Sequence, residues 1–79
     1  MSDIDLFVRI GETIYGPNWK AALAQDLGVR RASVQQWANG KYTLRPEIWA
    51  MVAEAIRLRR EELGELLSLI DDKARAHER

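Results

Sequence analysis

Between Lys20 and Asn39 the chain reads KAALAQDLGVRRASVQQWAN. This stretch predicts two short helices that cross at close range on either side of a tight turn. The crossing needs a small side chain on the first helix, which Ala24 supplies. The turn needs a residue that tolerates a positive φ, which Gly28 supplies four positions later. Five apolar residues are then placed to share one core: Leu23, Leu27, Val29, Val34 and Trp37. The stretch therefore predicts a helix-turn-helix whose second helix protrudes.

Apolar residues keep a spacing of three and four on both sides of this stretch, and no two-residue alternation predicts a strand. We expect short helices over residues 3–15, 19–27 and 31–39. Ser2 and Asn18 are suitable N-caps for the first two. Either Leu6 or Phe7 then faces inward from the first helix, and Gly16-Pro17 ends it because proline cannot continue a helix.

A long helix is predicted to follow, beginning at Pro46 and reaching about residue 75. Proline fits the first turn of a helix, and no turn signal interrupts residues 57–69. We expect this helix to bend near Gly64; the alternative is a break near Arg60, with a fifth helix starting at Glu61. The chain is thus expected to be all-α, with four to five helices in one domain over 1–79 and a C-terminal extension over 57–79.

Composition excludes several classes of function. The chain has 79 residues, 47% of them apolar, which suits one small packed domain, and the absence of cysteine excludes disulfides and thiolate metal sites. No acids, bases and nucleophiles converge in the pattern, and the single histidine, His77, lies in a charged tail, so we expect no enzyme, metal or cofactor. The sequence has no apolar run of about 18 residues and no basic start typical of a signal peptide, so we expect a cytoplasmic protein without a membrane segment.

Charge is unevenly distributed although the chain is neutral overall. Residues 19–45 carry a net charge of +4, because they contain five basic residues and one acidic residue, Asp26. Residues 1–18 and residues 46–79 each carry a net charge of −2. Local potential attracts a polyanion more directly than net charge does. The middle third is therefore the part suited to nucleic acid.

The layout resembles the helix-turn-helix of the lambda-repressor and Cro-like family of phage and bacterial regulators. The resemblance covers residues 4–56 and rests on Leu23-Ala24, Leu27-Gly28-Val29, Val34, Trp37, Asn39-Gly40-Lys41 and Arg45-Pro46. It implies a lambda-repressor-like domain that binds the major groove of double-stranded DNA. The chain departs from the family in having Arg30 at the cap of the second helix, where Ser, Thr or Asn is usual, and in its longer C-terminal part.

The resemblance also implies which residues touch DNA, because the family reads bases with the first turn and outward face of the second helix. With Val34 facing the core, steps of 100° place Ala32, Gln35 and Gln36 on the far side. The implied base-contacting residues are Arg31, Ala32, Gln35 and Gln36; arginine pairs well with guanine, and glutamine with adenine. The residues suited to phosphate contacts are Lys20, Arg30, Asn39, Lys41 and Arg45.

Four further apolar residues lie on one stripe of the C-terminal helix: Leu63, Leu66, Leu67 and Ile70. Left exposed, they would form a sizeable apolar patch. We expect residues 59–74 to form the two-fold interface of a homodimer, which would place two recognition helices about 34 Å apart on an inverted repeat. The alternative is that the stripe folds back over the first helix.

The expected function is that of a sequence-specific DNA-binding transcriptional regulator, acting as a homodimeric repressor without a small-molecule ligand. The alternative is a protein-interaction module, antitoxin-like or a phage inhibitor, that uses the same fold to bind a protein. Zero net charge and the long C-terminal helix of mixed charge favour this alternative, whereas the +4 centre favours DNA.

Overall fold

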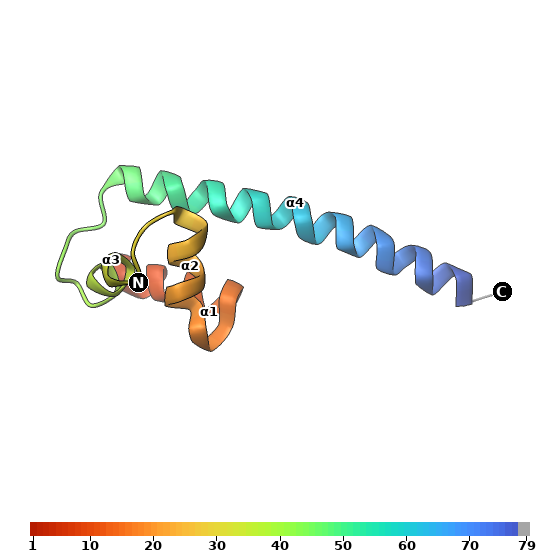
Figure 1. The fold of residues 1–79 in the computed structure, drawn as a ribbon, viewed down its shortest axis with the longest axis horizontal. Helices are drawn as coiled ribbons and strands as arrows, with labels where there is room; N and C mark the ends of the chain where they lie inside the picture. Colours follow the sequence, from red (N-terminus) through yellow and green to blue (C-terminus); the bar gives the residue numbers. More distant parts are fainter. Residues whose placement is uncertain (78–79) are drawn as a thin grey trace.

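In the computed structural model, which describes residues 1–77, three short helices precede one long C-terminal helix (Figure 1). The elements are α1 (Asp3–Tyr15), the 3-10 turn η1 (Gly16–Asn18), α2 (Trp19–Leu27), α3 (Arg31–Ala38) and α4 (Pro46–His77). No strand forms within the described residues. The last two residues of the predicted C-terminal extension, Glu78 and Arg79, lie outside them.

The N-cap predicted for α1 is confirmed, whereas the N-cap predicted for α2 is not. The Ser2 hydroxyl caps α1, since Oγ accepts a hydrogen bond of 3.0 Å from the Asp5 amide. The expectation that Asn18 caps α2 is wrong, because its side chain makes no cap bond. Residues 16–18 continue as a 3-10 turn, so Asn18 has φ −98° and ψ 29°, whereas a capping residue has an extended backbone.

The core is centred on Phe7, whose side chain is fully buried. All three tryptophans of the chain pack edge-to-face on this ring: Trp19 at 5.7 Å between ring centroids, and Trp37 and Trp49 at 6.3 Å each. The aliphatic core residues around them come from α2, α3, the following loop and α4: Leu23, Ala24, Val34, Leu44 and Val52. One ring therefore joins the four helices, and of the two inward residues considered for α1 it is Phe7, not the more exposed Leu6, that is buried.

Gly11 allows α1 and the start of α2 to approach closely. It is buried, and a Cβ built on it would overlap the six-membered ring of Trp19. Trp19 consequently lies flat against α1 as a lid, with 5% of its surface exposed. Any larger residue at position 11 would push this tryptophan away from Phe7.

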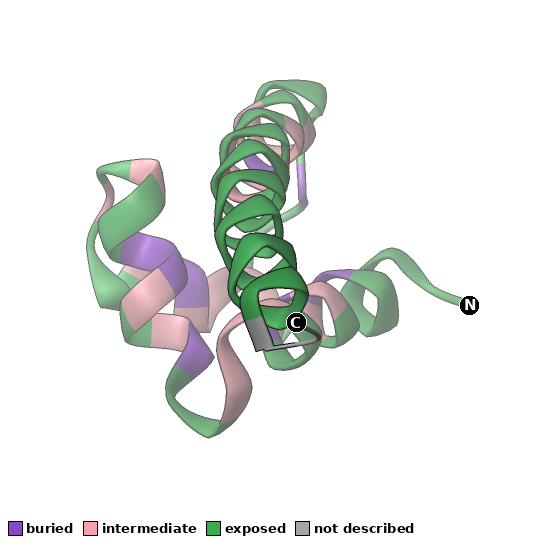
Figure 2. Cartoon of the chain, turned by 90° about the vertical axis from the view of Figure 1, so that its right-hand side faces the viewer, coloured by how far each residue is buried: buried purple, intermediate pink, exposed green. Residues whose placement is uncertain are grey.

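The long helix α4 is unbroken from Pro46 to His77, so the alternative of a break near Arg60 and a fifth helix is wrong. Its first half packs on the rest of the molecule through Val52, while every residue from Arg60 to Ala76 is exposed. Figure 2 shows this contrast, with burial confined to the helices behind the projecting end of α4. The apolar stripe does not fold back over α1, because the helix carries it away from α1 (Figure 1).

We call residues 1–59 the body and residues 60–76 the distal segment. The body holds every buried residue of the described chain. Among the described helices, none is both long enough and apolar enough to span a membrane.

Candidate nucleic-acid interface

The turn between α2 and α3 has the geometry that its sequence predicts. Gly28 has φ 69° and ψ 31°, in the left-handed region that favours glycine. Its amide and that of Val29 donate hydrogen bonds back to the last turn of α2, the latter to the Ala24 carbonyl at 3.0 Å. Ala24 itself is 3% exposed, as expected of a small side chain at a helix crossing. The two helices are thus held at close range by the buried Ala24 and by the backbone hydrogen bonds of the turn.

Helix α3 turns one side to the core and the other to solvent. Val34 is fully buried, and Trp37 packs against Phe7. Arg31 and Ala32, in the first turn, are exposed. Of the four residues proposed to contact bases, the other two, Gln35 and Gln36, are half-buried. The first turn of α3 is therefore the most accessible part of this helix.

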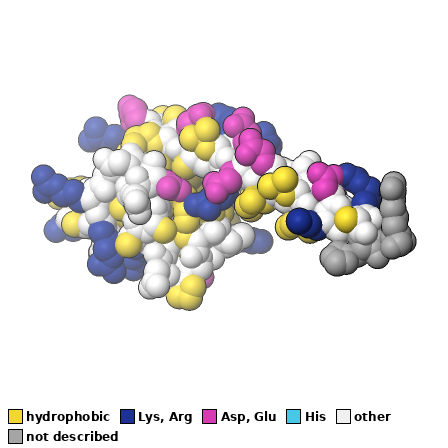
Figure 3. Space-filling view, turned by 45° about the vertical axis from the view of Figure 1, so that its right-hand side comes forward, with side chains coloured by type: hydrophobic (Ala, Val, Ile, Leu, Met, Phe, Trp, Pro, Cys, Tyr) yellow, Lys and Arg dark blue, Asp and Glu magenta, His cyan; other side chains and the backbone are white. Residues whose placement is uncertain are grey.

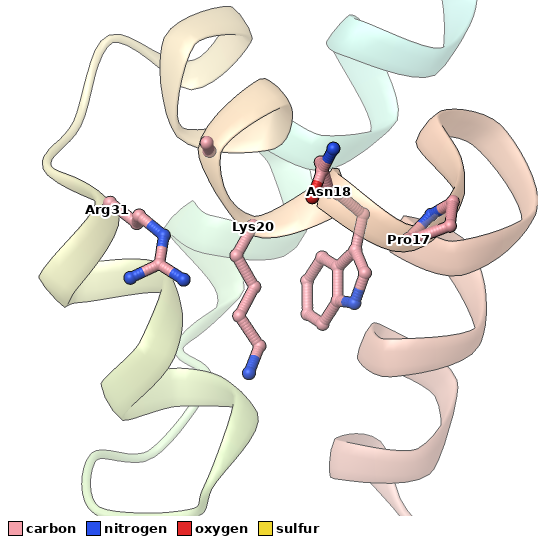
Figure 4. A pocket seen from close by; sticks show the side chains of 6 residues that line it. Pro17, Asn18, Lys20 and Arg31 are labelled. Atoms are coloured by element: carbon pink, nitrogen blue, oxygen red, sulfur yellow. The ribbon is translucent and has the colours of Figure 1, made fainter.

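Two basic side chains meet at the N-terminal ends of α2 and α3. Lys20 and Arg31 line one surface recess together with Pro17, Asn18, Trp19 and Ala21. Figure 4 shows both side chains extending toward the same side of the molecule. The N-terminal ends of helices favour anions, and Arg30, the N-cap of α3, makes no side-chain cap bond. This corner of the molecule is suited to a phosphate group.

The loop after α3 brings two more basic residues to a second recess. Lys41 and Arg45 line it with Trp37, Tyr42, Thr43 and Ile48. The loop is anchored at Lys41, whose amide donates to the Gln36 carbonyl at 2.9 Å and to Asn39 Oδ1 at 3.0 Å. The Asn39 oxygen accepts a bond within this turn, and the side-chain NH2 of Asn39 is the group that can donate to a phosphate.

Sequence reasoning missed Tyr42 at this recess. Its ring is 53% exposed, and the Lys41 Nζ lies 5.8 Å from the ring centroid. An exposed aromatic residue between two predicted phosphate-contacting residues was the available signal. Its hydroxyl is a further group that can donate to a phosphate oxygen.

Basic side chains gather on the body. Figure 3 shows Lys and Arg at the end of the molecule away from the C-terminus, while most Asp and Glu side chains in this view lie over α4. The five basic residues of 19–45 are all on or beside the helix-turn-helix. The surface potential is consequently most positive around α3, although the chain as a whole is neutral.

No family model, curated protein or solved structure matches this chain. Function therefore has to be argued from the arrangement of its own residues. No cluster of three or more His, Cys, Asp or Glu side chains that could hold a metal ion occurs in the described part of the chain.

A polar cluster of Tyr15, Asp26 and Arg59 joins α1, α2 and α4 where the body ends. The Tyr15 hydroxyl donates to Asp26 Oδ2 at 2.6 Å, and the Arg59 guanidinium lies 3.5 Å from the same oxygen and 5.2 Å from the Tyr15 ring centroid. Partial burial, and then the hydrogen bond to the Asp26 carboxylate, raise the pKa of Tyr15 to about 12. The only sequence signal was Arg59 itself, a charged residue at seven-residue spacing between Val52 and Leu66.

The residues predicted to form the dimer interface all lie on the distal segment and are exposed. Leu63, Leu66, Leu67 and Ile70 have 47–61% of their surface accessible. Leu69, which the sequence analysis left out, is 61% exposed beside them. Leu66, Leu69 and Ile70 line a shallow groove along the helix with Asp72, Lys73 and Ala76. Within the described residues, nothing in a single chain covers this surface.

Proposed function

We propose that this protein is a sequence-specific DNA-binding transcriptional regulator of the lambda-repressor-like type. In this proposal α3 enters the major groove, with Arg31, Ala32, Gln35 and Gln36 at base edges. Residues around it hold the phosphates: Lys20, Arg30, Asn39, Lys41 and Arg45. The protein acts as a homodimeric repressor that blocks a promoter by occupying it.

The observation that supports this proposal best is the pairing of Lys20 and Arg31 on one side of the molecule (Figure 4). A buried Val34 fixes the rotation of α3, whose exposed first turn borders the recess of Lys20 and Arg31 and whose last turn borders the recess of Lys41 and Arg45. This is the arrangement that a protruding recognition helix requires. No comparable group of basic residues lines the recesses on α4, where carboxylates accompany each one.

The test is a gel-shift measurement on the promoter upstream of the protein's own gene, followed by selection from random duplexes if that promoter is not bound. Arg31→Ala should weaken binding to the selected site by about 1–3 kcal/mol and relax preference at one base pair. Lys41→Ala should weaken binding to selected and random DNA about equally. Arg57→Ala is the matched control, because this arginine is exposed on α4 and pairs with Glu54. Identical behaviour of all three variants on both DNAs would contradict the assigned roles.

Salt dependence provides an independent check on the electrostatic part of the proposal. A dimer that makes about 6–10 phosphate contacts should lose roughly 10³–10⁵-fold in affinity between about 50 and 200 mM salt. Binding that stays constant over this range for every duplex tested argues against DNA as the ligand.

Dimerisation is tested by Leu66→Glu combined with Ile70→Glu. Because both side chains are exposed in one chain, the double variant should keep the cooperative unfolding of the body, lose at most the helical circular dichroism of the distal segment, and become monomeric by light scattering, with much weaker operator binding. Ser68→Glu is the matched control, because residue 68 lies on the opposite side of the same helix. A double variant that remains dimeric, or that unfolds, contradicts an interface at these residues.

A second candidate function is supported by the exposed apolar face of the distal segment. In this alternative the protein is an interaction module, antitoxin-like or an inhibitor, that binds another protein. The double variant distinguishes the two: a protein-binding module loses its partner and has no DNA site to lose, whereas the regulator loses operator binding as it becomes monomeric.

A further inference from the structure

The exposed apolar face of the distal segment lies on the same side of α4 as the body. Val52 and Ile56 pack on the body. Leu66 lies two heptads after Val52, and Leu63 lies one heptad after Ile56. An α-helix drifts by only about 20° per heptad from such a repeat. The unoccupied apolar face therefore begins where the body ends, on the same stripe of one continuous helix, which curves gently along its length (Figure 1).

A parallel pairing of two such helices is excluded on two grounds. The body and the exposed apolar face lie on the same side of α4. If two such faces met in parallel, both bodies would occupy the space between the two helices and would overlap. The heptad rows would also place Arg59 against Arg59 and Lys73 against Lys73 in the seam, and like charges at facing positions are unfavourable. Arg59 is moreover already engaged with Asp26.

We propose that two copies of this chain pair antiparallel through their distal segments. The two-fold axis crosses the pair at the height of residue 68 along the helix, although the Ser68 side chain lies on the side away from the seam. This arrangement rests on the self-association included in the proposed function. In this register, residues facing each other across the pair have numbers that add to about 136. Leu66 of one copy then faces Ile70 of the second, while Leu67 and Leu69 each lie beside their own counterparts near the axis. All the strongly exposed apolar residues of the segment are brought into one cluster.

Length and charge both favour this register. The distal segment runs from Arg60 to Ala76, and in this register Arg60 faces Ala76, so a second copy covers the exposed length from end to end. Lys73 lies against Leu63 of the second copy with the carboxylate of Glu62 beside it. Lys73, which would face its own kind in a parallel pair, therefore meets an opposite charge in this register.

The antiparallel pair sets a long spacing between the two recognition helices. Figure 1 shows α3 beside the end of α4 that starts at Pro46. From Pro46 to Ser68 the helix rises by about 33 Å at 1.5 Å per residue, so the two copies of α3 are separated by about 66 Å along the helix direction. This is about twice the 34 Å expected for half-sites one DNA turn apart. The dimer therefore does not fit adjacent one-turn half-sites.

Disulfide cross-linking tests the orientation directly, because the protein has no cysteine of its own. Leu63→Cys and Lys73→Cys are prepared separately, mixed under reducing conditions to exchange subunits, and then oxidised without DNA. In the antiparallel pair two copies of position 63, or of position 73, are ten residues apart along the axis, about 15 Å. A disulfide requires Cα atoms within about 7 Å. Each variant alone should therefore stay uncross-linked, while the mixture should form a cross-linked dimer.

Ser68→Cys is the control for random collision, since residue 68 lies on the helix side away from the seam and should not cross-link. Circular dichroism verifies that each variant remains helical. Efficient cross-linking of either variant alone overturns the proposal in favour of a parallel pair, and an uncross-linked mixture also overturns it. Because DNA is absent, the result is separate from operator binding: antiparallel cross-linking by a protein that binds no DNA contradicts the regulator function and leaves the pairing intact.

Discussion

Replacing Phe7 by alanine removes the ring on which all three tryptophans pack. Deletion of a buried phenylalanine costs about 3–5 kcal/mol, and each edge-to-face pair adds about 0.5–1.5 kcal/mol beyond its burial. Phe7 is fully buried and makes three such pairs, at 5.7–6.3 Å, so we expect a loss at the upper end, about 5 kcal/mol. A chain of this length has a total stability of about 4–12 kcal/mol. The Phe7→Ala protein should therefore retain at most about 7 kcal/mol, and it should be largely unfolded at 25 °C if the parent lies at the lower end of that range.

Two further variants separate the ring contacts from burial. Phe7→Leu keeps most of the buried volume and loses the three ring pairs, which predicts a cost of about 1.5–3 kcal/mol. Leu6→Ala, next to it on α1 but 40% exposed, should cost less than about 1 kcal/mol. The assay is urea unfolding followed by circular dichroism at 222 nm. A Phe7→Leu protein as stable as the parent would show that the edge-to-face pairs contribute nothing. A Phe7→Ala protein no less stable than Leu6→Ala would refute the central position of Phe7.

Other substitutions probe the remaining parts of the structure. Trp37→Ala should destabilise the protein by about 3–5 kcal/mol in the same urea assay, and unchanged unfolding would place this ring on the surface. Gly28→Ala should cost about 1 kcal/mol because alanine is strained at φ 69°, and the midpoint of thermal unfolding should fall accordingly. Because the pKa of Tyr15 is raised to about 12 in the folded protein, its contribution to stability is complete below pH 10 and decreases as the pH rises toward 12. Absorbance at 295 nm should show this late ionisation in the parent and not in Tyr15→Phe, and equal titration curves per tyrosine would contradict it.

Local sequence signals were sufficient to predict the positions of the three short helices. Ser2 and Gly28 act through side-chain or backbone contacts within five residues of themselves, so their roles could be predicted from neighbouring residues. Gly16-Pro17-Asn18 was correctly predicted to end α1. Its continuation as a 3-10 turn was not, because the same residues fit several kinds of turn. The rotation of α3 followed from one periodic pattern that places Val34 and Trp37 on the same side.

Contacts between residues distant in the sequence could not be predicted in the same way. The pairing of Arg59 with Asp26 spans 33 residues, and heptad spacing shows only that Arg59 interrupts an apolar row. The same spacing fits a stripe that folds back and one that stays exposed, so the position of the distal segment had to come from the structure. Helical geometry placed Gln35 and Gln36 on the far side of α3 from Val34, but both are half-buried, because a periodic pattern does not show how far neighbouring elements cover a helix.

The exposure of the distal segment links helix formation to protein concentration. In a single chain these residues are exposed as far as Ala76, and Gly64 lowers their helix propensity by about 1 kcal/mol relative to alanine. A helix of this length without packing is only marginally stable in water. If the chain pairs through this segment as proposed, the C-terminal end of α4 should fray on dilution, and mean ellipticity at 222 nm should fall. Occupancy of an operator by the dimer would then rise more steeply than linearly with the amount of protein, so that a modest change in expression level gives a sharp change in repression.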